Sequence, residues 1–237
     1  MLSKFYQKNK KIIRFVFFFI AFFFISYVQL IPIILFKIDL NSMSETTEML
    51  LSIFSSSVLV LLFYLAYKNE LKNDWKDFKK NYMPYLDIAF KYWVIGLIVM
   101  ALSNQIISIF SPIKIAENEQ AVQGMIEGTP LLAFITTTIL APITEEMTFR
   151  KTFKDVLDGK WLFILMSGLT FGSLHVVLSL DSLFSLFYII PYSSLGISFA
   201  YILYKTKNIF SCIAIHAFHN GILTIISIAL SVIGAVL

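Results

Sequence analysis

The chain has 237 residues, of which 58% are hydrophobic and 14% are charged, and its formal net charge at pH 7 is +4. This composition excludes an ordinary soluble domain and is typical of a polytopic membrane protein. A single cysteine, Cys212, also excludes an internal disulfide and a metal site built from cysteines.

Apolar stretches of about the length that a helix needs to cross a bilayer follow one another along the chain. They are residues 12–36, 50–67, 88–110, 131–149 or somewhat beyond, 161–178, 183–204 and 209–237. The first stretch lacks a small-residue cleavage site, so we expect a retained spanning helix there and not a signal peptide. The last stretch is too long for one crossing and contains Gly221, which makes two helices an option. The expected fold is a single all-α transmembrane domain of seven to eight spans.

Two segments between the spans carry patterns of their own. Leu71, Trp75, Phe78 and Tyr82 recur at helical spacing among charged residues, which predicts an amphipathic helix lying at the membrane interface. Residues 111–129 are polar, and we expect them to form an outer loop.

The basic residues predict the orientation. All but two of the 19 lysines and arginines precede the first span or lie around alternate, same-side loops; the exceptions are Lys37 and Lys114. The positive-inside rule then places the N-terminus in the cytoplasm. The net charge is therefore explained by topology in a lipid bilayer, and we expect no nucleic-acid partner. Frequent Lys, Ile and Phe are typical of an AT-rich bacterial genome, so the bacterial plasma membrane is the expected location.

The stretch from Pro142 to Arg150 holds two adjacent acids, Glu145 and Glu146, at the end of an apolar run. A charge at membrane depth costs roughly 2.5–3.5 kcal/mol or more, so such a pair is a functional-site candidate. Pro142 has no N–H to offer the carbonyl of Thr138, and we expect the helix to be disturbed just before the acids.

Counting residues from the loops places several polar groups at a similar depth. If Gly159 and Lys160 form a helical turn, Glu145 and His175 lie equally far from it, roughly 20 Å at 1.5 Å per residue. His216 lies roughly 15 Å beyond the next loop by the same rise. Acid and imidazole groups from separate helices are therefore predicted to meet.

Spacing within each helix divides these groups further. Glu146 and Arg150 are four residues apart, so the guanidinium can neutralise that carboxylate and leave Glu145 free. His216 and Asn220 share a helix face by the same spacing, as do Phe171 and His175. His219 is rotated off that face, and we expect it to pack or to support the site indirectly.

These groups suggest a hydrolytic site without a serine or cysteine nucleophile. Glu145, its basicity raised by a low-dielectric site, could deprotonate a water held with His175. His216 and Asn220 could donate hydrogen bonds to the oxyanion that develops.

Three motifs, Glu145-Glu146-x-x-x-Arg150, Phe171-x-x-x-His175 and His216-x-x-x-Asn220, stand in this order on successive apolar stretches. Together they resemble the motifs of the CPBP family (CAAX protease and bacteriocin-processing, or Abi), which includes the type II CAAX prenyl endopeptidase. The resemblance covers roughly residues 128–221; residues 1–110 carry no motif.

The resemblance implies an intramembrane peptidase of up to eight helices. Glu145 would be the base, His175 its partner, and His216 and Asn220 the oxyanion side, with Glu146, Arg150 and Phe171 supporting them. The substrate would be a small or membrane-associated peptide entering from the cytoplasmic leaflet, and a prenylated one is not expected in a bacterium.

Metal dependence stays open at this point. A divalent metal such as zinc could be held by nitrogen and oxygen ligands from Glu145, Glu146, His175 and His216. The HExxH spacing of common zinc proteases is absent, and a water activated by glutamate alone is the competing mechanism.

Two further functions compete with proteolysis. The same pocket could serve a non-catalytic bacteriocin-immunity or regulatory protein that binds a partner. Intramembrane acids and histidines also mark ion or proton paths in transporters, although the chain shows no inverted repeat of the kind many transporters have.

Overall fold

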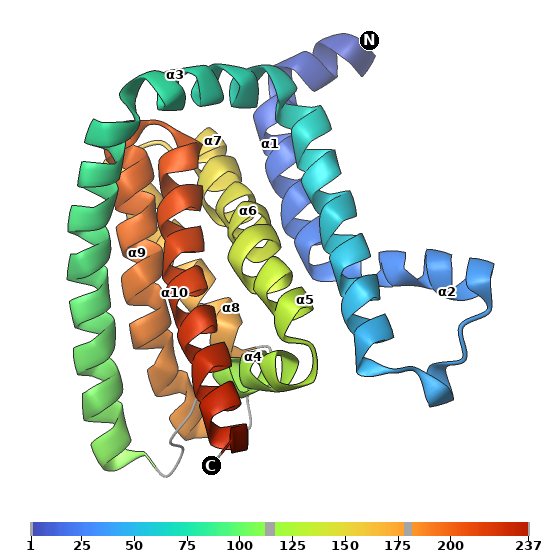
Figure 1. Cartoon of the computed structure of the whole chain (residues 1–237). Helices are drawn as coiled ribbons and strands as arrows, with labels where there is room; N and C mark the ends of the chain where they lie inside the picture. The colour runs from blue at the N-terminus through green and yellow to red at the C-terminus, as the bar shows by residue number, and fades with distance from the viewer. Residues whose placement is uncertain (1, 112–116, 178–181, 237) are drawn as a thin grey trace.

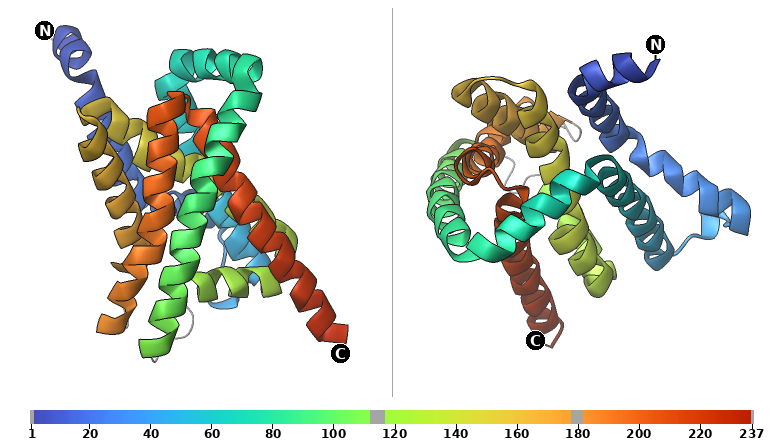
Figure 2. Two further views of the ribbon diagram at one scale, coloured as in Figure 1. Left: turned by 90° about the vertical axis from the view of Figure 1, so that its left-hand side faces the viewer. Right: turned by 90° about the horizontal axis from the view of Figure 1, so that it is seen from above.

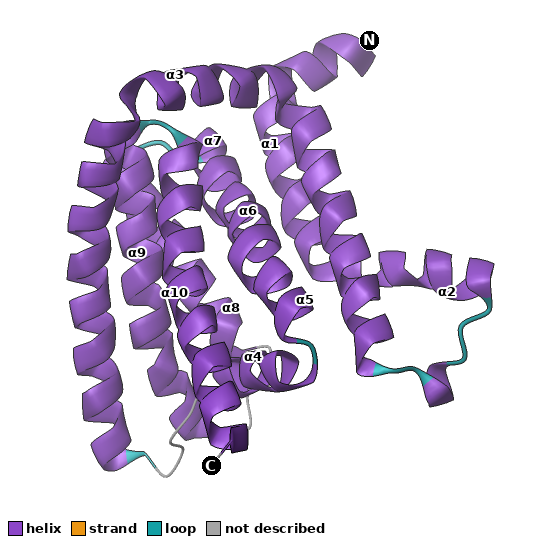
Figure 3. Ribbon diagram, viewed as in Figure 1, coloured by secondary structure: helices purple, strands orange, loops and turns teal. Residues whose placement is uncertain are grey.

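The computed structural model describes residues 2–111, 117–177 and 182–236. Within these ranges every regular element is a helix and none is a strand (Figure 3). The all-α fold class predicted from the sequence is therefore confirmed. Five helices are long and apolar enough to cross a membrane in the described residues.

The first apolar stretch does not form one straight helix. Helix α1, Leu2–Phe24, is followed by a 3-10 segment, η1, Ile25–Gln29, and by a short helix, α2, Leu30–Phe36. Figure 1 shows α2 running sideways, away from the bundle. Pro32 explains the break, because it cannot donate to the carbonyl of Val28 within η1. The predicted span over residues 12–36 lies within one candidate membrane span, Asn9–Phe36, whose helix is interrupted at η1.

The second and third apolar stretches belong to one long helical element, α3, Glu45–Phe110, preceded by the short 3-10 turn η2, Leu40–Ser42. Its two ends run along the bundle, and its middle lies across one end of it (Figures 1 and 2). Asn81 has non-helical angles, φ −119° and ψ 22°, where the chain bends into the second arm. The predicted amphipathic helix is confirmed as a helix: Leu71 packs against the core, and Trp75 and Phe78 face Phe210.

The polar stretch after α3 is not simply a loop. Helix α4, Glu117–Gly128, occupies most of it, and Figure 1 shows α4 lying across the end of the bundle opposite the middle of α3. Polar residues can form this helix because Val122, Met125 and Ile126 give it one apolar side, which packs with Met49 and Ala133. The expectation of an outer loop therefore missed an element.

The acid-bearing stretch forms a composite helix that follows Thr129. Its parts are α5, Pro130–Phe134; a π-helical segment η3, Ile135–Leu140; α6, Ala141–Glu145; a second π-helical segment η4, Glu146–Thr152; and α7, Phe153–Val156. The helix thus continues past the acids, as the depth count required. Gly159 forms the turn that follows, with φ +94°, a conformation that favours glycine.

The last helices complete the bundle. They are α8, Lys160–Val177; the 3-10 segment η5, Leu183–Tyr188; α9, Ile189–Thr206; and α10, Ile209–Val236. The predicted end of the fifth stretch at Leu178 lies outside the described residues. Gly221 lies inside α10, which is one helix, so the option of two helices after Ile209 is not what the structure shows.

Helices α8 and α9 approach each other closely because small residues line their contact. A Cβ atom at Gly168 would lie 2.6 Å from the backbone nitrogen of Ile197, and one at Gly172 would lie 2.5 Å from that of Ser193. Glycines four residues apart are a common device for close helix packing in membranes. This contact fixes the spacing between His175 on α8 and the residues on α9.

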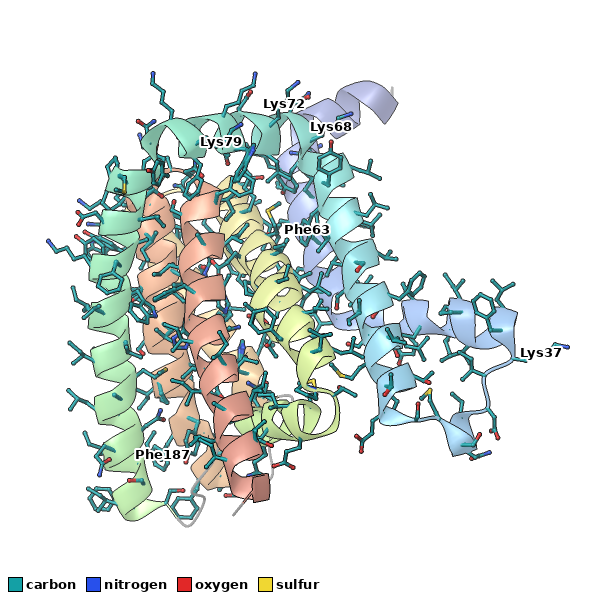
Figure 4. The ribbon with its side chains drawn as sticks, in the orientation of Figure 1. Lys37, Phe63, Lys68, Lys72, Lys79 and Phe187 are labelled. Atoms are coloured by element: carbon teal, nitrogen blue, oxygen red, sulfur yellow. The ribbon has the colours of Figure 1, made fainter. Side chains whose placement is uncertain are left out.

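Several basic residues gather at one end of the molecule, whereas Lys37 lies away from it beside α2 (Figure 4). Lys68, Lys72 and Lys79 lie on the part of α3 that crosses the bundle, whereas Phe187 lies at the other end, on the side of α4 (Figure 4). Arg14 and Lys151 both pair with Glu70 near the crossing, at 2.7 and 3.2 Å. The grouping agrees with the alternation of basic loops from which the orientation was predicted.

Candidate active site

The disturbance predicted at Pro142 takes the form of a π-helical turn. In a π-helix the donor to a carbonyl comes from five residues further on, and for Thr137 that residue is Pro142, which has no N–H. The side chain of Asn220 fills this role, since its Nδ2 donates to the Thr137 carbonyl oxygen at 2.9 Å. The carbonyl that Asn220 serves is thus that of Thr137, the residue before Thr138. The irregular helix thereby holds Asn220 in place.

One half of the site, which we call the closed part, is formed by Glu146 and Arg150 and the rings around them. Both side chains have no solvent exposure, and Arg150 Nε lies 3.1 Å from Glu146 Oε2. The guanidinium carbon lies 4.3 Å from the ring centre of Phe171 and 5.7 Å from that of Phe199. Its nitrogens find no hydrogen bond of good geometry among the described residues. Charge and aromatic contact therefore hold Arg150.

The other half, which we call the open part, centres on Glu145. Its Oε2 atom lies 3.8 Å from Nε2 of His216 and 4.0 Å from Nε2 of His175. The side chains of Glu145 and His175 keep 16% and 19% of their surface exposed. The predicted meeting of Glu145 with both histidines is thus what the structure shows.

Hydrogen bonds orient the two imidazoles. His216 Nδ1 lies 2.8 Å from Glu146 Oε1, and His175 Nδ1 lies 2.8 Å from the carbonyl oxygen of Phe171. A carbonyl or an ionised carboxylate can only accept, so both Nδ1 atoms carry hydrogen. The Nε2 atoms of both rings are then free to form hydrogen bonds with a molecule bound next to Glu145.

Aromatic rings fix the same two histidines from the side. His175 contacts Phe171 at 4.3 Å between ring centres, as the spacing predicted, and stacks on Tyr192 at 5.0 Å. His216 stacks on Phe199 at 4.8 Å. Neither Tyr192 nor Phe199 was indicated by the motifs, because both lie on α9 between them.

His219 has a more direct place than the sequence suggested. Its Nδ1 accepts a hydrogen bond of 3.2 Å from Nε1 of Trp93, and the residue lines the same cavity as Glu145. Trp93 lies on the second arm of α3, in the half of the chain without motifs. The supporting role expected for His219 therefore has a named partner.

These residues face a cavity of about 730 Å³. It extends from the open part along α10 and α3 to α4. The lining includes both motif residues and N-terminal ones: Glu145, Phe171, His175, His216, His219, Asn220, Met100, Asn104 and Val122. A volume of this size is typical of ligand sites. Glu146 and Arg150 are not part of the lining, which separates the two acids by surroundings as well as by partners.

The predicted metal ligands do not close around one ion. Ligands of a tetrahedral zinc bound at about 2.0–2.1 Å lie roughly 3.4 Å apart, whereas the imidazole nitrogens lie 3.8 and 4.0 Å from Glu145. Glu146 is engaged by Arg150 and His216. In the part of the chain that the structure describes, no group of three or more His, Cys, Asp or Glu side chains is placed to hold a metal.

Comparisons with known proteins agree with this geometry. Residues 127–222 match the model of a family described as "Type II CAAX prenyl endopeptidase Rce1-like". That segment contains each of the motifs and every residue of the open and closed parts. No solved structure matches the chain significantly.

Two curated proteins are similar over most of the chain. "Putative membrane peptidase YdiL" of Bacillus subtilis (strain 168) is 26% identical over 179 residues, 72% of this chain and 67% of that protein. An "Uncharacterized protein" of Mycoplasma capricolum is 28% identical over 188 residues, 73% of this chain and 54% of that protein. The chain thus spans about two thirds of one relative and about half of the other. With the motif geometry and the match over residues 127–222, these similarities support a relationship of this chain to the CPBP family and to membrane proteases.

Proposed function

We propose that the chain is an intramembrane endopeptidase in which Glu145 activates a water molecule. The observation that carries the proposal is the open part of the site: a carboxylate oxygen 3.8 and 4.0 Å from two oriented imidazole nitrogens, facing a cavity of about 730 Å³. A water bonded at about 2.8 Å to two atoms spans about 4.6 Å at a tetrahedral angle and about 4 Å at an angle near 90°. The spacing therefore suits a water held between Glu145 and either histidine.

The first step is attack by this water on the carbonyl carbon of a peptide bond. Glu145 takes one proton of the water as the new C–O bond forms, and His175 Nε2 accepts a hydrogen bond from the other. Positioned general bases of this kind typically contribute 10²–10⁴ to the rate. Phe171 and Tyr192 keep the imidazole in the orientation that this requires.

The second step is collapse of the tetrahedral intermediate. Asn220 has two N–H groups and uses one on Thr137, so the other is free to donate to the oxyanion. His216 can also donate from Nε2 in its protonated form, in which both ring nitrogens are donors. Glu145 returns its proton to the leaving nitrogen as the C–N bond breaks, which releases a carboxylic acid and an amine.

The closed part supports these steps from behind. Glu146 fixes the His216 ring through Nδ1, and Arg150 neutralises the charge of Glu146. Glu146 and Arg150 are positioning residues in this proposal, since neither lines the cavity. The substrate is a small or membrane-associated peptide, because the reacting groups lie within a helical bundle and the cavity is too small for a folded protein.

Cleavage in proteoliposomes tests the proposal. Wild-type protein is expected to release new N-termini from a library of membrane-associated peptides, as detected by mass spectrometry. Glu145→Gln keeps the shape of the side chain but is a far weaker base, and turnover should fall at least about 100-fold. Full turnover by this variant would contradict the mechanism. A cellular phenotype that survives both Glu145→Ala and His175→Ala would instead favour a binding or immunity role.

Metal dependence is tested separately. The proposed mechanism needs no metal, so cleavage should persist after the purified protein is treated with EDTA and shown by elemental analysis to be metal-free. Loss of cleavage that stoichiometric zinc restores would show that Glu145 and the histidines are ligands.

A further inference from the structure

The cavity extends from Glu145 toward α4 and not toward the basic end of the molecule. Its far part is lined by side chains of the second arm of α3 and of α4, including Asn104, Gln105, Glu119, Val122 and Gln123. Figure 1 shows α4 at the end of the bundle opposite the crossing part of α3. The reacting groups are therefore connected to the end that lacks the basic loops.

This far part is polar and carries negative charge. Two side-chain amides of α3, Asn104 and Gln105, interrupt the apolar sequence of its second arm and line the cavity. Among the described residues, Glu119 and Glu145 are the two acids of the cavity lining, and that part of the lining contains no lysine or arginine. Polar and ionisable groups at such a depth usually mark substrate paths.

Glu119 is available for a ligand. Its hydrogen-bond donor is a neutral side chain, Gln123, whose Nε2 lies 3.4 Å from Glu119 Oε1. Among the described residues no cation forms an ion pair with it. The side chain is half-buried beside the cavity, so a cation there would interact with it more strongly than in open water.

Contacts connect this far part to the reacting groups. The neighbouring Asn118 and Tyr192 both line the cavity, and Tyr192 stacks on His175 at 5.0 Å and an interplanar angle of 26°. A peptide that lies along α4 would therefore continue past Tyr192 to Glu145. Met100, Val122 and Leu223 supply apolar walls along the same cavity.

We propose that Glu119, with Asn104, Gln105 and Gln123, forms a subsite that binds a cationic group of the peptide substrate, a Lys or Arg side chain or a free N-terminus. The subsite is reached from the α4 end of the bundle. This inference rests on the proposed peptidase function and adds to it a substrate class and a direction of entry. It replaces the expected entry from the cytoplasmic leaflet, because the positive-inside rule puts the α4 end on the opposite side.

Charge-matched peptides test the subsite. Fluorogenic peptides that differ only by Lys, Gln or Glu at one scanned position are compared by kcat/KM, and their binding to Glu145→Gln protein is measured by fluorescence anisotropy. Wild-type protein should prefer the Lys peptide over the Glu peptide about tenfold or more at one position, since a like charge opposite Glu119 is unfavourable. Glu119→Gln should remove the preference, and Glu119→Lys should reverse it. Glu127→Gln, on an exposed residue of α4 outside the cavity lining, should leave it unchanged.

The outcomes separate the two proposals. Retention of the charge preference in Glu119→Gln, or no preference in wild-type protein, overturns the subsite while leaving cleavage intact. If wild-type protein cleaves no peptide but Glu145→Gln protein still binds the Lys peptide through Glu119, the subsite stands and the peptidase function fails.

Labelling of intact cells tests the direction of entry. A cysteine at Gly124, where a Cβ would meet no atom within 4 Å, is introduced into a Cys212→Ala background, and Lys79→Cys serves as its partner. A membrane-impermeant maleimide should label Gly124→Cys from outside and Lys79→Cys only after permeabilisation. The reverse pattern would place the α4 end in the cytoplasm and overturn the proposed route.

Discussion

The closed and open parts of the site contain adjacent acids in opposite situations. Glu146 has no exposed surface and is held by Arg150 and His216, whereas Glu145 keeps 16% of its side chain exposed beside the cavity. The reason is helical geometry: successive residues point about 100° apart, so one acid faces the bundle interior and the other faces the cavity. A doubled glutamate thus provides one group that fixes a histidine and another that is free to react.

Arg150→Met should have the largest effect. Removal of one partner from a buried ion pair leaves the Glu146 charge uncompensated and costs about 3–5 kcal/mol. We expect a large fall in unfolding temperature, or failure to accumulate, with loss of cleavage as a consequence. Lys151→Met is the matched control, since its ion pairs are more exposed and worth about 0–1 kcal/mol. Equal stability of the two variants would show that the closed part of the site is no more important for stability than an exposed ion pair.

His175→Asn tests the open part. The shorter side chain cannot place a nitrogen where Nε2 stands, so turnover should drop about 10²–10⁴-fold. Because His175 is partly exposed, the unfolding temperature should change little. Tyr192→Phe keeps the stacking ring and should lose far less activity. A large loss of stability in His175→Asn would show that this residue belongs to the structural part.

Asn220→Ala should lower both turnover and stability, turnover less than His175→Asn does and stability less than Arg150→Met does. Loss of an oxyanion donor typically lowers kcat by about 10²–10³, and the buried carbonyl of Thr137 would lose its donor at a cost of about 1–3 kcal/mol. Asn208→Ala is a suitable control, because its Nδ2 also donates to a backbone carbonyl, that of Asp74 at 2.7 Å, outside the cavity lining. That control should lose stability but keep kcat.

Trp93→Phe should have the smallest effect. It removes the 3.2 Å hydrogen bond to His219, worth about 0.5–1.5 kcal/mol, and leaves an aromatic ring in place. We expect a change of a few-fold in KM with little change in kcat, measured on any cleaved peptide. A loss as large as that of His175→Asn would place His219 among the reacting groups.

The sequence predicted the site better than it predicted the path of the chain. Residue counting placed Glu145 level with His175, and spacing paired Glu146 with Arg150, because a regular rise per residue applies to any apolar helix. The sideways turn of α2 and the single helix over Gly221 depend on packing and on Pro32. Hydropathy does not report these features.

Contacts between distant segments were also beyond sequence reasoning. Trp93 and Tyr192 reach the histidines through the bundle, and neither carries a motif. The Gly168-x-x-x-Gly172 spacing on α8 was a readable signal for the close contact with α9. The π-helical form of the disturbance at Pro142 follows from a partner, Asn220, that lies far along the chain.

Parallel measurements on Glu145→Gln and Glu146→Gln test most directly whether Glu145 is the reacting acid and Glu146 the structural one. Both substitutions are isosteric, and each purified variant is assayed for unfolding temperature and for peptide cleavage. The account predicts that Glu145→Gln unfolds like the wild type and does not cleave, whereas Glu146→Gln unfolds at a clearly lower temperature. Full cleavage by Glu145→Gln, or a stability loss confined to that variant, would contradict it.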